Sequence, residues 1–160
     1  MPWRGATAGP RRCCCWAWTA SPPTRRRHGR RAAEAALSLA AARLACALRA
    51  ADRVYHSESD RFAVLAPETD AAGALALGLR LVETVAEANC PHTESPWGVL
   101  TASAGIAVLA AHRSPEAALC AARRRLLQAK RAGGCAVAAP GVLRRPPGEG
   151  GQAPLRSAMR

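Results

Sequence analysis

The residues best suited to chemistry lie near the middle of the chain, at Arg49, Asp52 and Asp60. A guanidinium presents a planar set of N–H donors, and a carboxylate accepts hydrogen bonds or coordinates a hard cation such as Mg²⁺. Arg49 and Asp52 are three positions apart, so at the end of a helix both side chains would point to the same side. Such a pair can bind a polar ligand; the alternative is a surface ion pair that contributes about a few tenths of a kcal/mol.

The surrounding sequence predicts a helix followed by a β-hairpin. Residues 32–51 are rich in alanine, a strong helix former, with leucines at helical spacing. A short strand around residues 54–56, a polar turn at residues 57–60 and a returning strand that carries Phe62 and Val64 inward complete the motif. The arginine and aspartate pair is therefore expected close to the tip of the hairpin.

The formal net charge of +12 is concentrated at the two ends of the chain. Residues 1–31 hold eight arginines and no acidic residue, and residues 141–160 hold four arginines and one glutamate. The middle of the chain has 11 basic and 10 acidic residues, so the part expected to fold is nearly neutral. Basic ends can bind phosphate backbones without sequence preference. No nucleic-acid-binding motif accompanies them, and we expect no specific nucleic-acid partner.

The apolar and cysteine patterns favour a cytoplasmic protein. No run approaches the roughly 18 apolar residues of a membrane-spanning helix, and the start lacks a clean apolar region with a cleavage site. The seven cysteines include no C-x-x-C pair, and three of them are consecutive, which disfavours disulfides. We therefore predict a reduced cytoplasmic protein without a membrane partner. Cys90 and His92 alone make a weak pair of metal ligands.

The hairpin resembles the signature of the GGDEF domain, the fold of diguanylate cyclases, in which a G-G-[DE]-E-F tip holds a nucleotide phosphate and metal ions. In this register Glu58 and Ser59 stand at the two glycines, and Asp60 stands at the acidic third position. Arg61 replaces the glutamate, and Phe62 matches. The resemblance makes these five residues a remnant of the family's catalytic signature.

Other motifs follow in the order of the family. Arg49 and Asp52 have the spacing of its R-x-x-D product-inhibition site, which implies a binding site for cyclic di-GMP. Glu34 replaces the aspartate that hydrogen-bonds guanine in G-H-x-x-G-D-x-x-L, and Lys130 matches the lysine of A-L-Y-x-A-K-x-x-G. These two residues would be remnants of the nucleotide site. Residues 99–108 resemble the family strand [VL]-T-x-S-x-G-[IV]-A.

The resemblance implies an α/β fold of the GGDEF, or palm-like nucleotidyl cyclase, class: a mixed β-sheet flanked by helices over residues 29–139. Residues 140–160 are expected to be a disordered tail or linker, and residues 1–28 an irregular basic leader, because no helical or strand period is present there. The first strand is thus expected to be missing. We hypothesise that the leader is translated out of frame, since the third-base frame of residues 13–21 imposes Leu-Leu-Leu-Gly and an aspartate, as in the family's first strand.

The resemblance also sets expectations for activity. Diguanylate cyclases join two GTP molecules with two metal ions, which first-strand acids and the signature hold. Here Asp60 is the acid that remains, Arg61 adds a permanent cation, and Gly134 stands in place of a phosphate-contacting arginine. We expect a degenerate, catalytically inactive domain without a cofactor, which binds Mg²⁺ at Asp60 only if residual cyclase activity persists. The R-x-x-D pair would still bind cyclic di-GMP.

Three alternatives to an inactive cyclic di-GMP receptor stay open. The first is an active diguanylate cyclase that relies on Asp60. The second is an interaction module that pairs with another GGDEF domain or with a second copy of itself. The third is a fragment without function.

Overall fold

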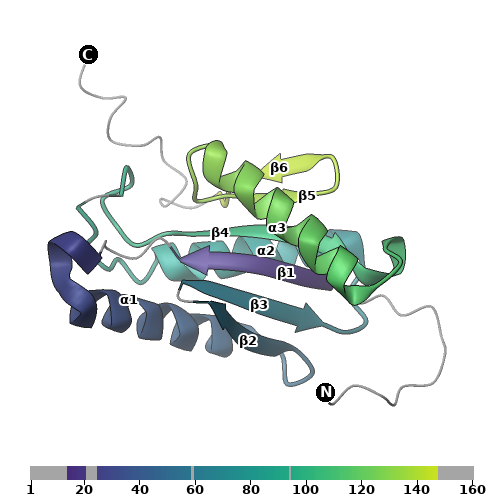
Figure 1. The fold of residues 1–160 in the computed structure, drawn as a ribbon, viewed down its shortest axis with the longest axis horizontal. Helices are drawn as coiled ribbons and strands as arrows, with labels where there is room; N and C mark the ends of the chain where they lie inside the picture. The colour runs from purple at the N-terminus through teal and green to yellow at the C-terminus, as the bar shows by residue number, and fades with distance from the viewer. Residues whose placement is uncertain (1–13, 21–24, 59, 94, 148–160) are drawn as a thin grey trace.

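The computed structural model describes residues 14–20, 25–58, 60–93 and 95–147 (Figure 1). Its elements in chain order are β1 (Cys14–Ala20), α1 (Arg25–Ala47), β2 (Arg53–Glu58), β3 (Arg61–Ala66), α2 (Ala71–Ala86), β4 (Ala102–Val108), the 3₁₀ helix η1 (Leu109–Ala111), α3 (Pro115–Arg131), β5 (Val137–Ala139) and β6 (Val142–Arg144). None of the helices in these residues is long and apolar enough to cross a membrane.

The strands form one mixed sheet in the order β2-β3-β1-β4-β5-β6. β4 and β5 run parallel, and the other neighbours are antiparallel. Figure 1 shows α3 in front of the sheet and α2 behind it, and α1 packs beside α2. The predicted α/β fold, a mixed sheet flanked by helices, is confirmed.

Polar capping side chains mark the starts of helices α2 and α3. The Asp70 carboxylate caps α2 by accepting a 2.8 Å hydrogen bond from the N–H of Gly73. The Ser114 hydroxyl caps α3 by accepting a 3.2 Å bond from the N–H of Ala117. Beyond α3, Gly133 has a positive φ of 100°, a conformation that glycine adopts without strain and that ends the helix.

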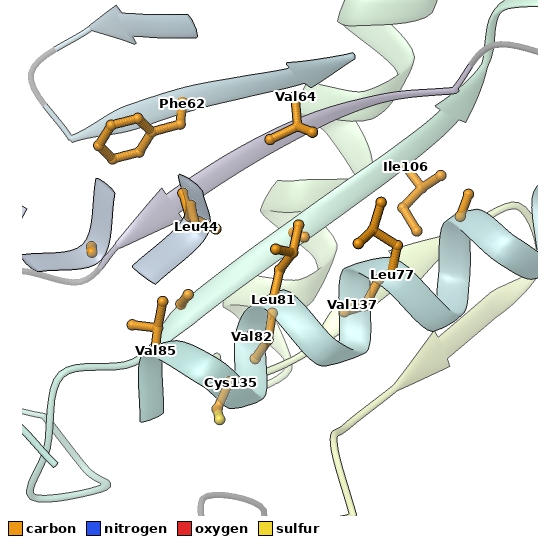
Figure 2. Close-up of a cluster of buried hydrophobic side chains, with 14 of the residues drawn as sticks. Leu44, Phe62, Val64, Leu77, Leu81, Val82, Val85, Ile106, Cys135 and Val137 are labelled. Atoms are coloured by element: carbon orange, nitrogen blue, oxygen red, sulfur yellow. The ribbon is translucent and has the colours of Figure 1, made fainter. Parts of the chain in front are cut away.

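The larger apolar core fills the space between the sheet and the layer of α1 and α2. Its side chains come from both helices, from β3 to β5 and from the loop before β5. Those labelled in Figure 2 are Leu44, Phe62, Val64, Leu77, Leu81, Val82, Val85, Ile106, Cys135 and Val137. A second core between the sheet and α3 consists mainly of alanines: Ala107, Ala118, Ala121, Ala122 and Leu126. Because alanine side chains are short, α3 lies close to the sheet.

The expectation of a missing first strand is wrong. Residues 14–20 form β1, which pairs with β3 on one side and with β4 on the other, at the centre of the sheet (Figure 1). A strand with helices on both faces of its sheet needs no alternation of apolar and polar residues, which explains why the sequence shows no strand period here. Residues 1–13 and 21–24 of the predicted leader lie outside the described part of the chain, and residues 25–28 belong to α1. The out-of-frame hypothesis concerns the gene and stays a prediction.

Helix α1 differs from its prediction at both ends. It begins at Arg25 rather than at residue 32 and ends at Ala47 rather than at residue 51. The Asp52 carboxylate explains the earlier end, because it accepts a 2.9 Å hydrogen bond from the N–H of Arg49. This amide would otherwise continue the helical ladder, and short acidic side chains offer such an alternative to helix.

The predicted disordered tail is ordered as far as residue 147. Residues 140–147, which we call the C-terminal strap, include β6, and β6 pairs with β5. The Arg145 guanidinium lies 5.3 Å from the ring centre of Trp97 and donates to the carbonyl of Ala132. Because Trp97 in turn donates to the carbonyl of Gly133 at 3.1 Å, the strap is fastened to the end of α3.

Candidate functional site

The β2–β3 hairpin forms as predicted. Its strands pair from Arg53 opposite Leu65 to Glu58 opposite Arg61, with an irregularity in register between residues 56 and 58. Phe62 and Val64 are buried in the larger core, as expected for the returning strand. Ser59 lies outside the described residues, as does the side chain of Glu58.

The tip of the hairpin contacts the end of α3. The carboxylate Oδ2 of Asp60 lies 3.9 Å from the Nζ of Lys130, so the structure brings two of the predicted site residues together. Both side chains keep more than a third of their surface exposed, and ion pairs in such surroundings contribute about 0 to 1 kcal/mol. The tip carboxylate has a cationic neighbour in Lys130, and Arg61 follows it in the chain.

Arg49 and Asp52 form a closed turn instead of lying on a helix. The N–H of Asp52 donates to the Arg49 carbonyl at 3.0 Å, and the Asp52 carboxylate accepts from the Arg49 N–H at 2.9 Å. Asp52 is buried, whereas Arg49 is exposed. In the described part of the chain no ion pair joins the guanidinium to this carboxylate, so the alternative of a simple surface ion pair is wrong. Asp52 shapes the turn, and Arg49 extends from it.

Two further arginines bind the backbone at this turn. Arg53, the first residue of β2, donates to the carbonyls of Ala50 and Asp52. Arg80, on α2, donates to the Ala47 carbonyl at the end of α1, at 2.8 Å. Three guanidinium groups thus gather around residues 47–53, which makes this turn a candidate site for an anionic ligand.

Sequence reasoning missed these two arginines for different reasons. Arg80 is 33 positions from its acceptor, and no local spacing could have indicated it. Arg53 directly follows the R-x-x-D pair, so its type and position were a usable indication. Arg53 can reach the carbonyls of Ala50 and Asp52 because the chain folds back in the closed turn, and that turn was not predicted.

The turn and the hairpin tip lie at opposite ends of β2 (Figure 1). Because six extended residues separate them, the distance along the strand is about 20 Å. The expectation that Arg49 and Asp52 lie close to the tip is therefore wrong, because the extended strand β2 separates residues that are near one another in the sequence. The two places must be considered as separate sites.

Glu34 has Arg30 as its ion-pair partner. It lies on α1, is exposed, and pairs with Arg30 one turn earlier at 3.3 Å. Helix α1 packs on the face of the sheet opposite α3, which carries Lys130. The structure thus does not join these two predicted remnants of the nucleotide site through any contact in the described residues.

The six-stranded mixed sheet, with an antiparallel hairpin at one edge and an R-x-x-D turn before it, defines an α/β domain of the nucleotidyl cyclase class. The sequence profile described as "Diguanylate cyclase, GGDEF domain" matches residues 24–135. The chain belongs to this family. No curated protein matches the chain.

Solved GGDEF domains have the same fold. The GGDEF domain of DgcB from Caulobacter crescentus, in complex with c-di-GMP, superposes with a TM-score of 0.69 at 14% identity, over 82% of this chain and 80% of that one. The GGDEF domain of YfiN, or TpbB, from Pseudomonas aeruginosa gives 0.68 at 25% identity, over 80% and 81%. The active GGEEF domain of a diguanylate cyclase from Vibrio cholerae gives 0.67 at 14% identity, over 79% and 81%.

The metal ions that the family implies do not fit the residues of this chain. Hard divalent cations bind carboxylate oxygens, yet β1 consists of CCWAWTA and contains no acidic residue. At the tip, Asp60 lies beside the ammonium of Lys130. No group of three or more His, Cys, Asp or Glu residues in the described ranges is placed to hold a metal ion. Among the side chains that the structure describes, the tip therefore offers the Asp60 carboxylate with a cationic neighbour, whereas a metal site would need several carboxylates.

Proposed function

We propose that this GGDEF domain acts in cyclic di-GMP signalling by binding the dinucleotide and not by making it. The proposed binding site is the Arg49–Asp52 turn, that is, residues 49–52. Arg49 contacts the ligand, Asp52 holds the turn in shape, and Arg53 and Arg80 raise the positive potential around it. The proposal includes a degenerate, catalytically inactive hairpin tip that binds no cofactor.

The observation that carries the binding proposal is the closed geometry of the turn. Two reciprocal hydrogen bonds between Arg49 and Asp52 fix the backbone while the Arg49 guanidinium remains exposed. A preformed turn lowers the entropy lost on binding. A guanidinium can form paired hydrogen bonds to a phosphate or to the acceptor edge of guanine, and it can stack on the base.

We infer that the domain does not synthesise cyclic di-GMP because cationic side chains occupy the hairpin tip, where the family holds its metal ions. Phosphoryl transfer depends on cations that neutralise the developing negative charge, which the family supplies as metal ions. Asp60 has Lys130 as its neighbour, Arg61 follows it, and the first strand contributes no carboxylate. Replacement of the signature glycines by Glu58 and Ser59 adds side chains where phosphates would approach the backbone.

A cytoplasmic location is part of the same proposal. Four cysteines whose side chains the structure describes are free thiols, namely Cys46, Cys90, Cys120 and Cys135. Free thiols agree with a reducing compartment.

Calorimetry with cyclic di-GMP tests the binding, and a GTP turnover assay in Mg²⁺ or Mn²⁺ tests the activity. We expect binding without turnover. Arg49→Ala removes hydrogen bonds to a charged group, each worth about 1.5 to 3 kcal/mol, so the affinity should fall by roughly 10- to 100-fold. Arg124→Ala, which removes an exposed arginine on α3, should leave the affinity unchanged.

Each outcome decides one part of the proposal. Formation of cyclic di-GMP from GTP would refute the inactive tip and would favour the alternative of an active cyclase. No binding heat at high micromolar ligand would refute the receptor role. A similar loss of affinity in the Arg49 and Arg124 variants would show that net charge, and not this turn, attracts the ligand.

A further inference from the structure

We infer that Arg53 is a positioning residue that holds the Arg49–Asp52 turn in its binding shape. The inference rests on the proposed cyclic di-GMP site. It adds to that site a residue outside the R-x-x-D motif, one that acts on the ligand through the turn.

Arg53 connects the turn to the sheet. Its backbone belongs to β2, where it stands opposite Leu65 of β3. Its guanidinium Nη1 reaches back to the Asp52 carbonyl at 2.8 Å and to the Ala50 carbonyl. One end of the residue is therefore fixed by strand pairing, and the other end binds two carbonyl groups of the turn.

The turn has little else to hold it. Arg49, Ala50 and Ala51 are exposed, and alanine side chains at the surface contribute little packing. Apart from those of Arg53, the hydrogen bonds that hold residues 49–52 in the described structure are the reciprocal pair between Arg49 and Asp52. Without the Arg53 guanidinium, the carbonyls of Ala50 and Asp52 would be bonded to water, and the turn would open more readily.

The guanidinium also changes the field that an anionic ligand meets. The two carbonyl oxygens and the Asp52 carboxylate are negative, and on their own they would repel phosphate groups. A cation bonded to the carbonyls offsets this repulsion. Arg53 should therefore favour binding in two ways, by fixing the shape of the turn and by masking its negative groups.

Calorimetry on three variants of the full chain tests the inference. Arg53→Ala should weaken cyclic di-GMP binding about tenfold, which is the change in affinity expected when the free energy of about one hydrogen bond is lost. Arg53→Lys keeps a cation that can donate to these carbonyls, and it should recover part of the affinity. Arg124→Ala, which removes one positive charge from α3, is the matched control and should bind like the wild type.

A second measurement needs no ligand. Hydrogen exchange at the amides of Arg49 and Asp52 should accelerate in Arg53→Ala, while the midpoint of global thermal unfolding stays within about 2 °C of the wild type. Unchanged exchange at both amides would overturn the positioning role, whether or not the ligand binds. Wild-type affinity in Arg53→Ala would overturn it as well. Absence of binding by the wild type would refute the proposed receptor function, and the exchange rates would still decide whether Arg53 holds the turn.

Discussion

The contact between α3 and β4 at Gly105 gives the sharpest test of the fold. A Cβ atom at this position would overlap the backbone oxygen of Ala122 and the backbone nitrogen of Leu126. It would also lie 2.9 Å from the carbonyl carbon of Arg125, whereas ordinary van der Waals contact begins at 3.4 Å. These are main-chain atoms of a helix, so they cannot turn aside as a flexible side chain would. In Gly105→Ala the helix must therefore retreat from the sheet by at least about 0.5 Å, the difference between these two distances.

Such a retreat would weaken the whole alanine core beneath α3. A gap of about 0.5 to 1 Å removes roughly a quarter to a half of each dispersion contact across it. Overpacking typically costs about 1 to 3 kcal/mol, and contact with helix backbone puts this case at the upper end. We expect Gly105→Ala to lower the free energy of unfolding by about 3 kcal/mol, and the unfolding midpoint by roughly 10 °C for a chain of this size.

Urea unfolding followed by circular dichroism would measure the change, with Gly73→Ala as the control. A Cβ at Gly73 meets only side-chain atoms of Asp70 and Thr69, at 3.2 and 3.3 Å. Because alanine favours helix over glycine by about 1 kcal/mol, this variant should be as stable as the wild type or slightly more stable. If Gly105→Ala proved as stable as Gly73→Ala, α3 would not lie against β4 as described, and the reasoning would be refuted.

Two further predictions concern the end of α3. Burial raises the pKa of the Cys135 thiol from 9.0 to about 11, against the opposing effect of the Arg145 charge. The folded protein then keeps a proton that the unfolded chain loses, so stability should fall by about 1.4 kcal/mol per pH unit as the pH rises from 9 to 11. Urea unfolding at several pH values in this range should show the decline in the free energy of unfolding for the wild type and for the control Cys46→Ala, which removes an exposed thiol. If the free energy of unfolding of Cys135→Ala fell with pH at the same slope, Cys135 would not be its cause. Arg145→Ala should lower the free energy of opening the C-terminal strap by about 1 to 2 kcal/mol, and amide exchange at residues 142–144 should become faster. The control is Arg144→Ala. Because the Arg144 guanidinium donates to the neighbouring Leu143 carbonyl, its removal should leave the exchange rates unchanged.

Local patterns in the sequence were sufficient to predict several elements. The inward positions of Phe62 and Val64 predicted the returning strand of the hairpin, and the alanine-rich stretch predicted the greater part of α1. These features depend on neighbouring residues, which is why they can be inferred from a short window. The family resemblance placed these elements in the correct order.

Features that depend on distant partners were missed. β1 has no recognisable period, because it owes its strand conformation to β3 and β4 on its two sides. The C-terminal strap is composed like a linker, but Trp97 and the end of α3 hold it in place. At the candidate site, the spacing of Arg49 and Asp52 was informative, whereas the closed turn that joins them required the structure.

The central position of β1 limits how the protein can be shortened. A version that began at residue 29 would keep most of the sequence that resembles the family, but it would lose the strand that joins one half of the sheet to the other. Both β3 and β4 would then present a row of unpaired amides and carbonyls, and such open edges invite aggregation with neighbouring molecules. β1 thus joins the two halves of the sheet. Any version of the protein expressed for the measurements above should therefore retain residues 14–20.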